Sequence, residues 1–255
     1  MPIKIIEKMN NIKHKIIVMS GKGGVGKTTV AVNLAYSLSE KGFKVGLLDI
    51  DIHGPNTPKM LGLENKKFLT RGGKIIPIKA KKNLNVTSMA FLLEKEDAVI
   101  WRGPLKHKVI KQFTEDVDWG KLDYLIVDSP PGTGDEIISI SQLLNDIRGS
   151  IIVSTPQQVA LLDADKSIDF SKKMDIPIIG LIENMAGDMF GEGSVSHLAD
   201  DKYLNFLGSL KLDKNIIKSG DGGNPFVIDK SLDISKSFEN IVKKIMLFCE
   251  NRISK

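Results

Sequence analysis

The feature that most constrains the fold is a glycine-rich segment that joins a strand-like run to a helix-like run near the start of the chain. Residues 21–29 read Gly-Lys-Gly-Gly-Val-Gly-Lys-Thr-Thr. They follow the β-branched run at residues 15–19 and lead into the helical pattern of residues 28–41. Glycine adopts backbone conformations that other residues avoid, so such a loop can turn its backbone N–H groups inward. The chain must therefore build a strand, a tight loop and a helix in direct succession.

Strand-like and helix-like runs alternate along the rest of the chain. Apolar residues at three- and four-residue spacing predict four helices, at residues 28–41, 137–145, 159–174 and 231–250. Short β-branched runs predict strands at residues 15–19, 44–48, 84–88, 124–127, 150–153 and 178–182, with a weaker seventh at 206–210. The alternation predicts an α/β, doubly wound fold, with a mostly parallel sheet of about seven strands and helices on both faces.

Two stretches interrupt the alternation without dividing the chain. Residues 52–83 are rich in Gly, Pro and Lys, and we expect a long excursion that holds a small hairpin around Arg71-Gly72-Gly73. Residues 185–200 are rich in Gly and Asp. No Pro/Ser-rich linker and no internal repeat is present, so residues 1–255 are expected to form a single domain. Ligands of such sheets bind at the carboxyl ends of the strands, and functional residues are expected in the loops that follow them.

Composition narrows the class of protein. With 42% hydrophobic and 26% charged residues, the chain has the composition of a folded protein. No apolar run approaches the roughly 20 residues of a membrane-spanning helix, and the start of the chain lacks the apolar core of a secretory signal, so we expect a cytoplasmic protein. The formal net charge is +5 and the lysines are spread along the chain, which does not favour a nucleic-acid partner. Cys249 is the only cysteine, which excludes an intrachain disulfide and a four-cysteine metal site within one chain.

The glycine-rich segment matches G-x-x-x-x-G-K-[ST], the Walker A pattern of phosphate-binding loops. Its backbone N–H groups and the start of the following helix would hold phosphate oxygens. Lys27 is expected to reach the β- and γ-phosphates of ATP, and the Thr28 hydroxyl to bind Mg²⁺. The alternative is a glycine-rich turn without a ligand. The residues expected to contact the nucleotide are Gly21, Lys22, Gly23, Gly24, Val25, Gly26, Lys27, Thr28 and Thr29.

Aspartates stand at the ends of two predicted strands. Asp49 and Asp51 lie on the same side of an extended chain. We expect Asp51 to orient the water that attacks the γ-phosphate and Asp49 to contribute to the Mg²⁺ shell; the alternative for Asp51 is to cap the turn that follows. Asp128 ends a hydrophobic strand, the Walker B pattern, and is expected to hold Mg²⁺ through water. His53 is expected to be a loop residue, since no second histidine has ligand spacing.

The pair of lysines in the loop carries a first resemblance. K-G-G-x-G-K-T-T, with Lys22 and Lys27, resembles the deviant Walker A of MinD/ParA-type ATPases. The resemblance implies an ATP-sandwich homodimer in which Lys22 reaches phosphate on the partner subunit. There it would neutralise charge during phosphoryl transfer, as an arginine finger does. The alternative is that Lys22 is an ordinary exposed lysine.

Longer motifs carry a more specific resemblance, which extends from about residue 12 to about residue 245. The chain is similar to the Mrp/ApbC-type iron–sulfur cluster carrier ATPases at D-I-D-I-H-G-P-N-T-P (49–58), W-R-G-P (101–104), P-P-G-T-G-D (130–135), S-T-P-Q (154–157) and I-E-N-M (182–185). The resemblance implies a homodimeric, cytosolic ATPase that delivers clusters to apo-proteins. It also implies that Asn184 contacts the adenine ring, for which an amide offers a donor and an acceptor. Asn184 capping a turn is the alternative.

The chain departs from that family after Asn184. Typical carriers have a Cys-x-x-Cys pair there, whereas residues 185–193 contain no cysteine. Cys249 lies in a predicted core helix and is expected to be a small buried hydrophobic residue rather than a ligand. An iron–sulfur cluster is therefore a doubtful cofactor for this chain alone. A heterodimer with a relative that bears Cys-x-x-Cys would supply the missing thiolates.

Two other functions stay open on the sequence alone. One is a MinD/ParA-type positioning or partition ATPase that acts on a membrane or DNA, which is suggested by the basic, amphipathic residues 241–248. The same pattern is typical of a final helix that packs on the sheet, which we favour. The third function is a nucleotide-binding scaffold without turnover.

Overall fold

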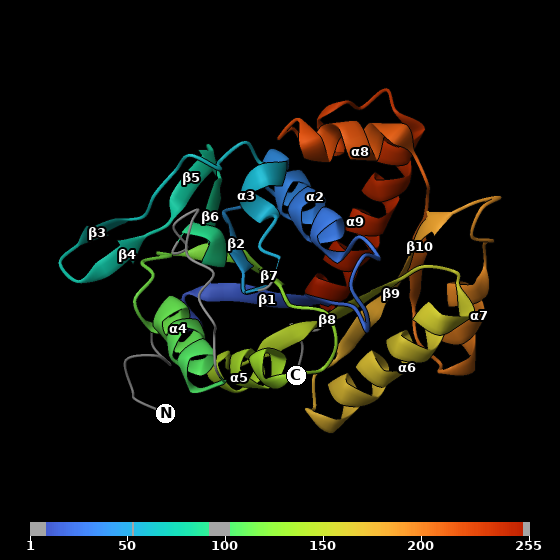
Figure 1. Ribbon diagram of the computed structural model, residues 1–255, viewed down its shortest axis with the longest axis horizontal. Coiled ribbons are helices and arrows are strands. Elements are labelled where there is room, and N and C mark those ends of the chain that lie inside the picture. Colours follow the sequence, from blue (N-terminus) through green and yellow to red (C-terminus); the bar gives the residue numbers. More distant parts are fainter. Residues whose placement is uncertain (1–8, 53, 92–102, 252–255) are drawn as a thin grey trace.

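An eight-stranded sheet runs through the molecule between two layers of helices (Figure 1). The computed structural model describes residues 9–52, 54–91 and 103–251. The strand order is β10-β9-β8-β1-β7-β2-β6-β5, and all neighbours are parallel except β5 and β6. The strands of this sheet are β1 (Ile12–Met19), β2 (Val45–Asp49), β5 (Ile78–Lys81), β6 (Leu84–Ser88), β7 (Leu122–Asp128), β8 (Ile147–Ser154), β9 (Ile178–Ala186) and β10 (Phe206–Lys211).

All seven predicted strands are present, and they make up the parallel part of the sheet. The eighth strand, β5, was not predicted. It reads Ile-Lys-Ala-Lys and is the antiparallel edge strand, so it lacks the continuous apolar run that marks a buried parallel strand. The hairpin expected around Arg71-Gly72-Gly73 is formed by β3 (Leu69–Arg71) and β4 (Lys74–Ile76). Gly72 and Gly73 have φ angles of 58° and 74°, as a tight two-residue hairpin turn requires.

The helices divide between the two faces of the sheet. Side chains of α2 (Lys27–Glu40) and α9 (Asp233–Asn251) share one hydrophobic cluster with the sheet, whereas α4 (Gly103–Glu115), α5 (Asp135–Leu143), α6 (Gln158–Lys173) and α7 (Ser194–Asp201) contribute to two others. Four of these helices, α2, α5, α6 and α9, were predicted. The sequence analysis missed α3 (Thr57–Met60), α4, α7 and α8 (Lys214–Asp221); α3, α7 and α8 are each only one or two turns long.

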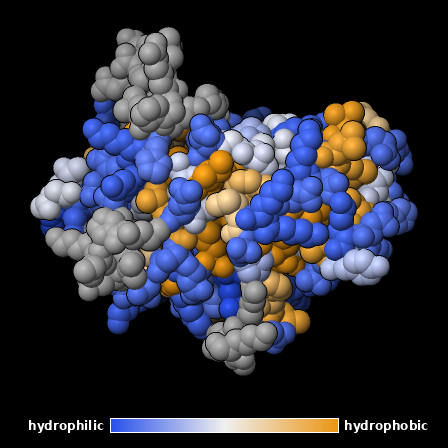
Figure 2. Space-filling view, turned by 90° about the horizontal axis from the view of Figure 1, so that it is seen from below, coloured by the Kyte–Doolittle hydropathy of each residue, from blue (hydrophilic) through white to orange (hydrophobic). Residues whose placement is uncertain are grey.

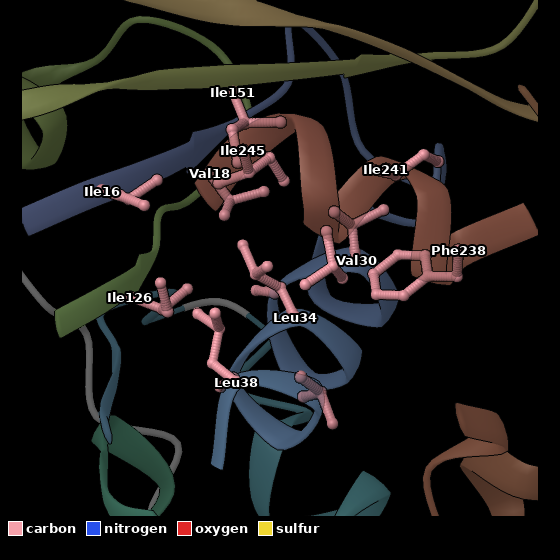
Figure 3. Close-up of a cluster of buried hydrophobic side chains, with 14 of the residues drawn as sticks. Ile16, Val18, Val30, Leu34, Leu38, Ile126, Ile151, Phe238, Ile241 and Ile245 are labelled. Atoms are coloured by element: carbon pink, nitrogen blue, oxygen red, sulfur yellow. The ribbon is translucent and has the colours of Figure 1, made fainter. Parts of the chain in front are cut away.

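The alternation of side chains along β1 builds both layers at once. Ile16 and Val18 face the cluster shared with α2 and α9, and Ile17 faces the opposite layer. Figure 3 shows Ile16 and Val18 on the same side as Leu34 of α2. The side chains of Ile16, Ile17, Val18 and Leu34 are fully buried, and burying each of them stabilises the fold by about 1.5–3 kcal/mol. This packing fixes the end of β1 and the start of α2, between which the glycine-rich loop lies.

The final helix packs on the sheet, as the sequence analysis favoured. Ile241, Val242, Ile245 and Cys249 of α9 are buried against β10 and α2. Among the described residues, no helix is both long enough and apolar enough to cross a bilayer. Figure 2 shows one face of the molecule, on which hydrophilic side chains surround separate patches of hydrophobic ones.

Candidate nucleotide-binding site

The glycine-rich loop closes tightly between β1 and α2. Gly24 and Gly26 have φ angles of 81° and 87°, in the left-handed region that favours glycine. A β-carbon at Gly26 would lie 2.0 Å from Asn184 Nδ2, and one at Gly21 would lie 2.0 Å from the Asp163 carbonyl oxygen of α6. The loop is therefore shaped both by its own backbone and by its close approach to β9 and α6.

The ammonium group of Lys27 lies among carboxylates inside this loop. Its Nζ is 2.5 Å from Asp128 Oδ1 and 3.9 Å from Asp51 Oδ2, and it is 3.4 Å from Thr28 Oγ1. The three strands β1, β2 and β7 are neighbours in the sheet, which brings these side chains to one edge. The fold therefore unites residues that are far apart in the sequence, as expected for the carboxyl ends of parallel strands.

Asp49 and Asp128 are directly opposite each other in the register of β2 and β7. Both carboxylates are fully buried. Burial and the charge of Asp128 raise the pKa of Asp49 to about 8. Burial also raises the pKa of Asp128, and the Lys27 ammonium opposes that rise. Two acidic groups and one ammonium group thus share a buried space, and this arrangement favours a further positive charge or a retained proton.

The Asp49 side chain is held by groups of the protein. Its Oδ2 accepts a hydrogen bond from Ser88 Oγ at 2.8 Å, and its Oδ1 accepts one from the Asp51 backbone N–H at 3.0 Å. These two bonds orient the Asp49 carboxylate, and its contribution to the Mg²⁺ shell stays a prediction. Asp51 Oδ1 in turn accepts a bond from the Gly54 N–H at 3.2 Å, a turn-capping contact of the kind named as the alternative for Asp51.

The remaining donors fit a magnesium ion that is bound mainly through phosphate and water. Asp128 Oδ2 is buried and has no hydrogen-bond partner among the described residues. Thr28 lies beside Lys27 at the start of α2 and lines the cavity. In the described part of the chain, no three His, Cys, Asp or Glu side chains could hold a metal ion by themselves. Mg²⁺ in nucleotide sites is usually held by one or two protein groups, so this donor set suits it.

Asn184, on β9, is buried against the glycine-rich loop. It is 3% exposed and its Nδ2 donates a hydrogen bond to the Val25 carbonyl at 2.8 Å. Its Oδ1 is buried without a hydrogen-bond partner among the described residues. The next residue, Met185, lines the cavity and has a φ of 59°. Asn184 therefore braces the loop, and one acceptor of its amide is left for another group.

Lys22 lies on the α6 side of the loop. Its Nζ is 3.4 Å from Gln157 Oε1, and the Ser20 hydroxyl donates a bond to the Lys22 carbonyl at 3.0 Å. Lys22 forms no ion pair within the described ranges, in contrast to Lys27. The structure thus separates the two lysines of the loop, one inside it and one at its rim.

A cavity of about 630 Å³ lies in front of the loop. The loop residues that line it are Gly23, Gly24, Gly26, Lys27, Thr28 and Thr29, and Asp51 lines it as well. The sequence analysis missed its other wall, which α3 and α8 supply through Lys59, Met60, Ile216, Ile217, Gly220 and Asp221. Short helices without a long periodic pattern gave no signal for these residues. His53, Trp101 and Arg102 lie outside the described residues.

The segment in which carriers of the resembled family have cysteines forms a closed turn here. Gly187 and Gly191 pair through two backbone hydrogen bonds of 3.0 and 2.8 Å. Glu183 binds the backbone N–H groups of Gly193 and Val195 at 2.9 and 3.0 Å, which fixes the start of α7. Cys249 is fully buried in the α9 core, and burial raises the pKa of its thiol to about 11. These residues do not fit an iron–sulfur cluster, which requires several accessible thiolates.

Known proteins resemble the chain over almost its whole length. A family model described as ParA, NUBPL iron-transfer P-loop NTPase, matches residues 11–246. An iron–sulfur cluster carrier protein of Methanocaldococcus jannaschii is 48% identical over 254 residues, which cover 95% of this chain and 87% of that protein. The iron–sulfur cluster carrier protein of Saccharolobus solfataricus is 42% identical, with 98% of this chain and 88% of that protein covered.

Solved structures agree with the fold. A nucleotide-binding protein of Archaeoglobus fulgidus, in complex with ADP, has a TM-score of 0.79 at 34% identity and covers 92% of this chain and 96% of its own. The Pyrococcus furiosus cell division ATPase MinD has a TM-score of 0.70 at 23% identity, covering 92% and 99%, and shows the shared fold alone. The glycine loop, its buried lysine and the extent of these matches lead to one conclusion. The chain belongs to the ParA family of NUBPL-type iron-transfer P-loop NTPases.

Proposed function

We propose that this chain binds Mg²⁺-ATP, hydrolyses the ATP as a homodimer in the cytoplasm, and acts in iron–sulfur cluster assembly or transfer. The main support for ATP hydrolysis is the position of the Lys27 ammonium, which lies between Asp128 and Asp51 inside the glycine-rich loop. The ADP in the related Archaeoglobus fulgidus structure supports a nucleotide in the cavity. The curated relatives support the link to iron–sulfur clusters.

In this proposal, each side chain of the site has a distinct task. Lys27 exchanges its carboxylate contacts for the β- and γ-phosphates of ATP and offsets their charge. Asp51, at the cavity wall, orients the water that attacks the γ-phosphate. Thr28 and Asp128 would hold Mg²⁺, which when bound neutralises phosphate charge. Asp49 positions Asp51 through its backbone N–H, a more indirect task than the one expected from sequence.

Lys22 completes the proposed mechanism across the dimer. Its ammonium is at the rim of the loop and donates a hydrogen bond to the neutral Gln157 amide at 3.4 Å. A neutral, exposed partner holds an ammonium weakly, so Lys22 can exchange this contact for phosphate on a second subunit. This would add positive charge where the transition state develops negative charge.

The cluster part of the proposal needs thiolates from outside this chain. Cys249 is buried, and residues 187–191 form a closed turn without cysteine. We therefore propose that the chain, besides forming the homodimer that hydrolyses ATP, also joins a relative bearing Cys-x-x-Cys in a heterodimer. In that heterodimer the relative supplies the cluster ligands for apo-protein clients. The positioning or partition alternative is less well supported, because the apolar face of α9 is buried against the sheet.

Variants of the loop test the ATPase. Lys27→Ala should abolish ATP binding in isothermal titration calorimetry. Asp51→Ala should bind ATP but release phosphate slowly. Lys22→Ala should bind ATP as a monomer but hydrolyse it slowly or dimerise weakly in light scattering. Lys172→Ala, which removes an exposed cation of α6 that does not line the cavity, is the matched control and should keep turnover. Normal turnover by Lys22→Ala would refute the proposal that Lys22 acts on phosphate of the partner subunit. If the wild-type protein binds ATP but does not hydrolyse it, the function would be that of a nucleotide-binding scaffold.

Reconstitution tests the cluster. The chain is incubated anaerobically with iron and sulfide, alone and with a Cys-x-x-Cys-bearing relative, each with and without ATP. Iron and acid-labile sulfide are then measured after gel filtration. We expect a cluster only in the mixed sample. A stable cluster on the chain alone would overturn the heterodimer, and no cluster in either sample would overturn the link to cluster transfer.

A further inference from the structure

One segment of the chain combines many basic residues with no acidic ones. Residues 65–91 contain seven basic residues and no Asp or Glu. Because the whole chain carries +5, the rest of it carries a net charge of −2. Lysines are spread along the whole chain, and in this segment no acidic residue stands among them. Its basic residues are Lys66, Lys67, Arg71, Lys74, Lys79, Lys81 and Lys82.

The segment forms the β3–β4 hairpin and the edge strand β5, and the hairpin extends away from the sheet at that edge (Figure 1). Contacts of β4 and of the residue before β3 hold it against the rest of the protein. Ile75 is 6% exposed and belongs to the core; its N–H donates to the Asp116 carbonyl at 2.8 Å, and its carbonyl accepts from the Asp118 N–H at 2.9 Å. The Phe68 ring packs edge-on against Phe113, with ring centroids 5.8 Å apart. The hairpin is therefore a fixed projection with one face turned to the core.

The opposite face of the hairpin carries both charge and apolar surface. Leu69 and Arg71 alternate with Thr70 along β3, and Arg71 is directly opposite Lys74 in the register. Like charges directly opposite each other destabilise a strand pair, so this pair costs the isolated hairpin stability. Leu69, on the same face, is 72% exposed. An acidic partner with an apolar side chain would relieve the repulsion and bury the leucine.

Two of these cations form ion pairs with acidic residues of the described ranges. Lys74 pairs with Asp118 at 3.8 Å, with both side chains about half exposed, and Lys81 pairs with Glu40 and lies over the Tyr36 ring. In the described ranges, the structure gives no ion pair to four other exposed cations of the segment, Lys66, Arg71, Lys79 and Lys82. Lysine on an edge strand also guards against aggregation, but that task needs neither the Arg71–Lys74 pair nor an exposed leucine.

We propose that this basic edge, defined as Leu69, Arg71 and Lys74 on the outward face of the hairpin and flanked in the sequence by Lys66, Lys79 and Lys82, is a docking surface for an acidic protein. A nucleic acid fits it less well. A phosphate backbone provides no apolar group that could bury the exposed Leu69 side chain. The Phe68 ring packs against the rings of Phe91 and Phe113 and is therefore not free to stack on bases. The proposal does not rest on ATP hydrolysis or on the cluster, and either could fail without affecting it.

The test measures binding of a labelled 16-residue peptide of Glu and Asp with Leu at every third position, by fluorescence anisotropy at low salt. Arg71→Glu/Lys74→Glu should weaken binding by about tenfold, because two exposed charge contacts are reversed. Leu69→Ser should weaken it by about fivefold. Lys172→Glu/Lys173→Glu changes the net charge equally at exposed positions of α6 and should stay within about twofold of wild type. All variants should keep wild-type circular dichroism and ATP hydrolysis.

Each other result would overturn the proposal. Absence of peptide binding to wild type, or equal weakening by the α6 control, would show that no specific surface exists. Tighter binding of a 16-base-pair DNA duplex than of the peptide, unaffected by Leu69→Ser, would assign the surface to nucleic acid instead. If the double variant does not fold, Arg71→Gln alone should still weaken peptide binding about threefold, and no change would refute the assignment.

Discussion

Replacing Gly26 by alanine forces the phosphate loop against Asn184. Gly26 has a φ of 87°, and a β-carbon there would lie 2.0 Å from Asn184 Nδ2. Asn184 is 3% exposed and its Nδ2 donates the 2.8 Å bond to the Val25 carbonyl. An alanine must therefore adopt a left-handed conformation and also displace a buried amide, which breaks that hydrogen bond.

The structure sets the size of both effects. The left-handed conformation costs a residue with a β-carbon about 1–2 kcal/mol. Leaving the Val25 carbonyl without its partner costs about 1–3 kcal/mol more. Gly26→Ala should thus lower the free energy of unfolding by about 2–5 kcal/mol. Gly24→Ala is the matched control, because Gly24 has a φ of 81° but no atom within 4 Å of a β-carbon; it should cost only about 1–2 kcal/mol.

A double-mutant cycle separates the clash from the backbone strain. Asn184→Ala removes the atom that a β-carbon at Gly26 would strike, so the double variant should be more stable than the sum of the two single changes predicts, by about 1–3 kcal/mol. Gly24→Ala should add to Asn184→Ala without coupling. Urea unfolding followed by circular dichroism measures all five variants. Equal costs at Gly24 and Gly26, or additivity of Gly26→Ala with Asn184→Ala, would refute the reasoning.

Three further predictions concern buried groups outside the loop. Burial and the charge of Asp128 raise the folded-state pKa of Asp49 to about 8, so the protonated group stabilises the fold at low pH and loses that effect as the pH rises toward 8. The Tm of Asp49→Asn, measured relative to the Tm of wild type, should therefore rise from about pH 5 to about pH 8. A difference in Tm that stays constant over this range would contradict the prediction. Cys249 should react with a thiol-exchange reagent only as fast as the protein unfolds, since its thiol is buried with a pKa raised to about 11; rapid labelling of native protein would refute this. Glu183→Gln should cost about 1–3 kcal/mol and speed hydrogen exchange in α7, whose start it caps, whereas exposed Asp188→Asn should change neither.

Local patterns in the sequence were sufficient for much of the fold. The seven parallel strands each carry their own short run rich in apolar residues, and the two turn glycines predicted the β3–β4 hairpin. The edge strand β5 was not predicted, because it pairs with a neighbouring strand on one side only and two of its four residues are lysine. Helix α8 was not predicted, because it is only two turns long and buries none of its residues, so it lacks the apolar periodicity of a core-facing helix.

The candidate site divides in the same way. The positions of Lys27 and Thr28 at the start of α2 could be predicted from the spacing of the loop, because the spacing itself sets where they lie relative to its backbone. The hydrogen bond between Ser88 and Asp49 could not be predicted, since Ser88 reaches Asp49 only after β2 and β6 pair. Nothing near Asn184 in the sequence indicates that its amide abuts Gly26.

The sequence alone determined the strand–loop–helix unit at residues 12–40, the family resemblance, and the absence of a cysteine pair after Asn184. These depend on residues that are neighbours in the chain. Tertiary structure decided which side chains share the buried charge around Lys27, that α3 and α8 form the second wall of the cavity, and that one face of the basic hairpin is left to solvent. Each of these depends on strands and helices that are distant in sequence and meet only when the apolar faces of the sheet are buried.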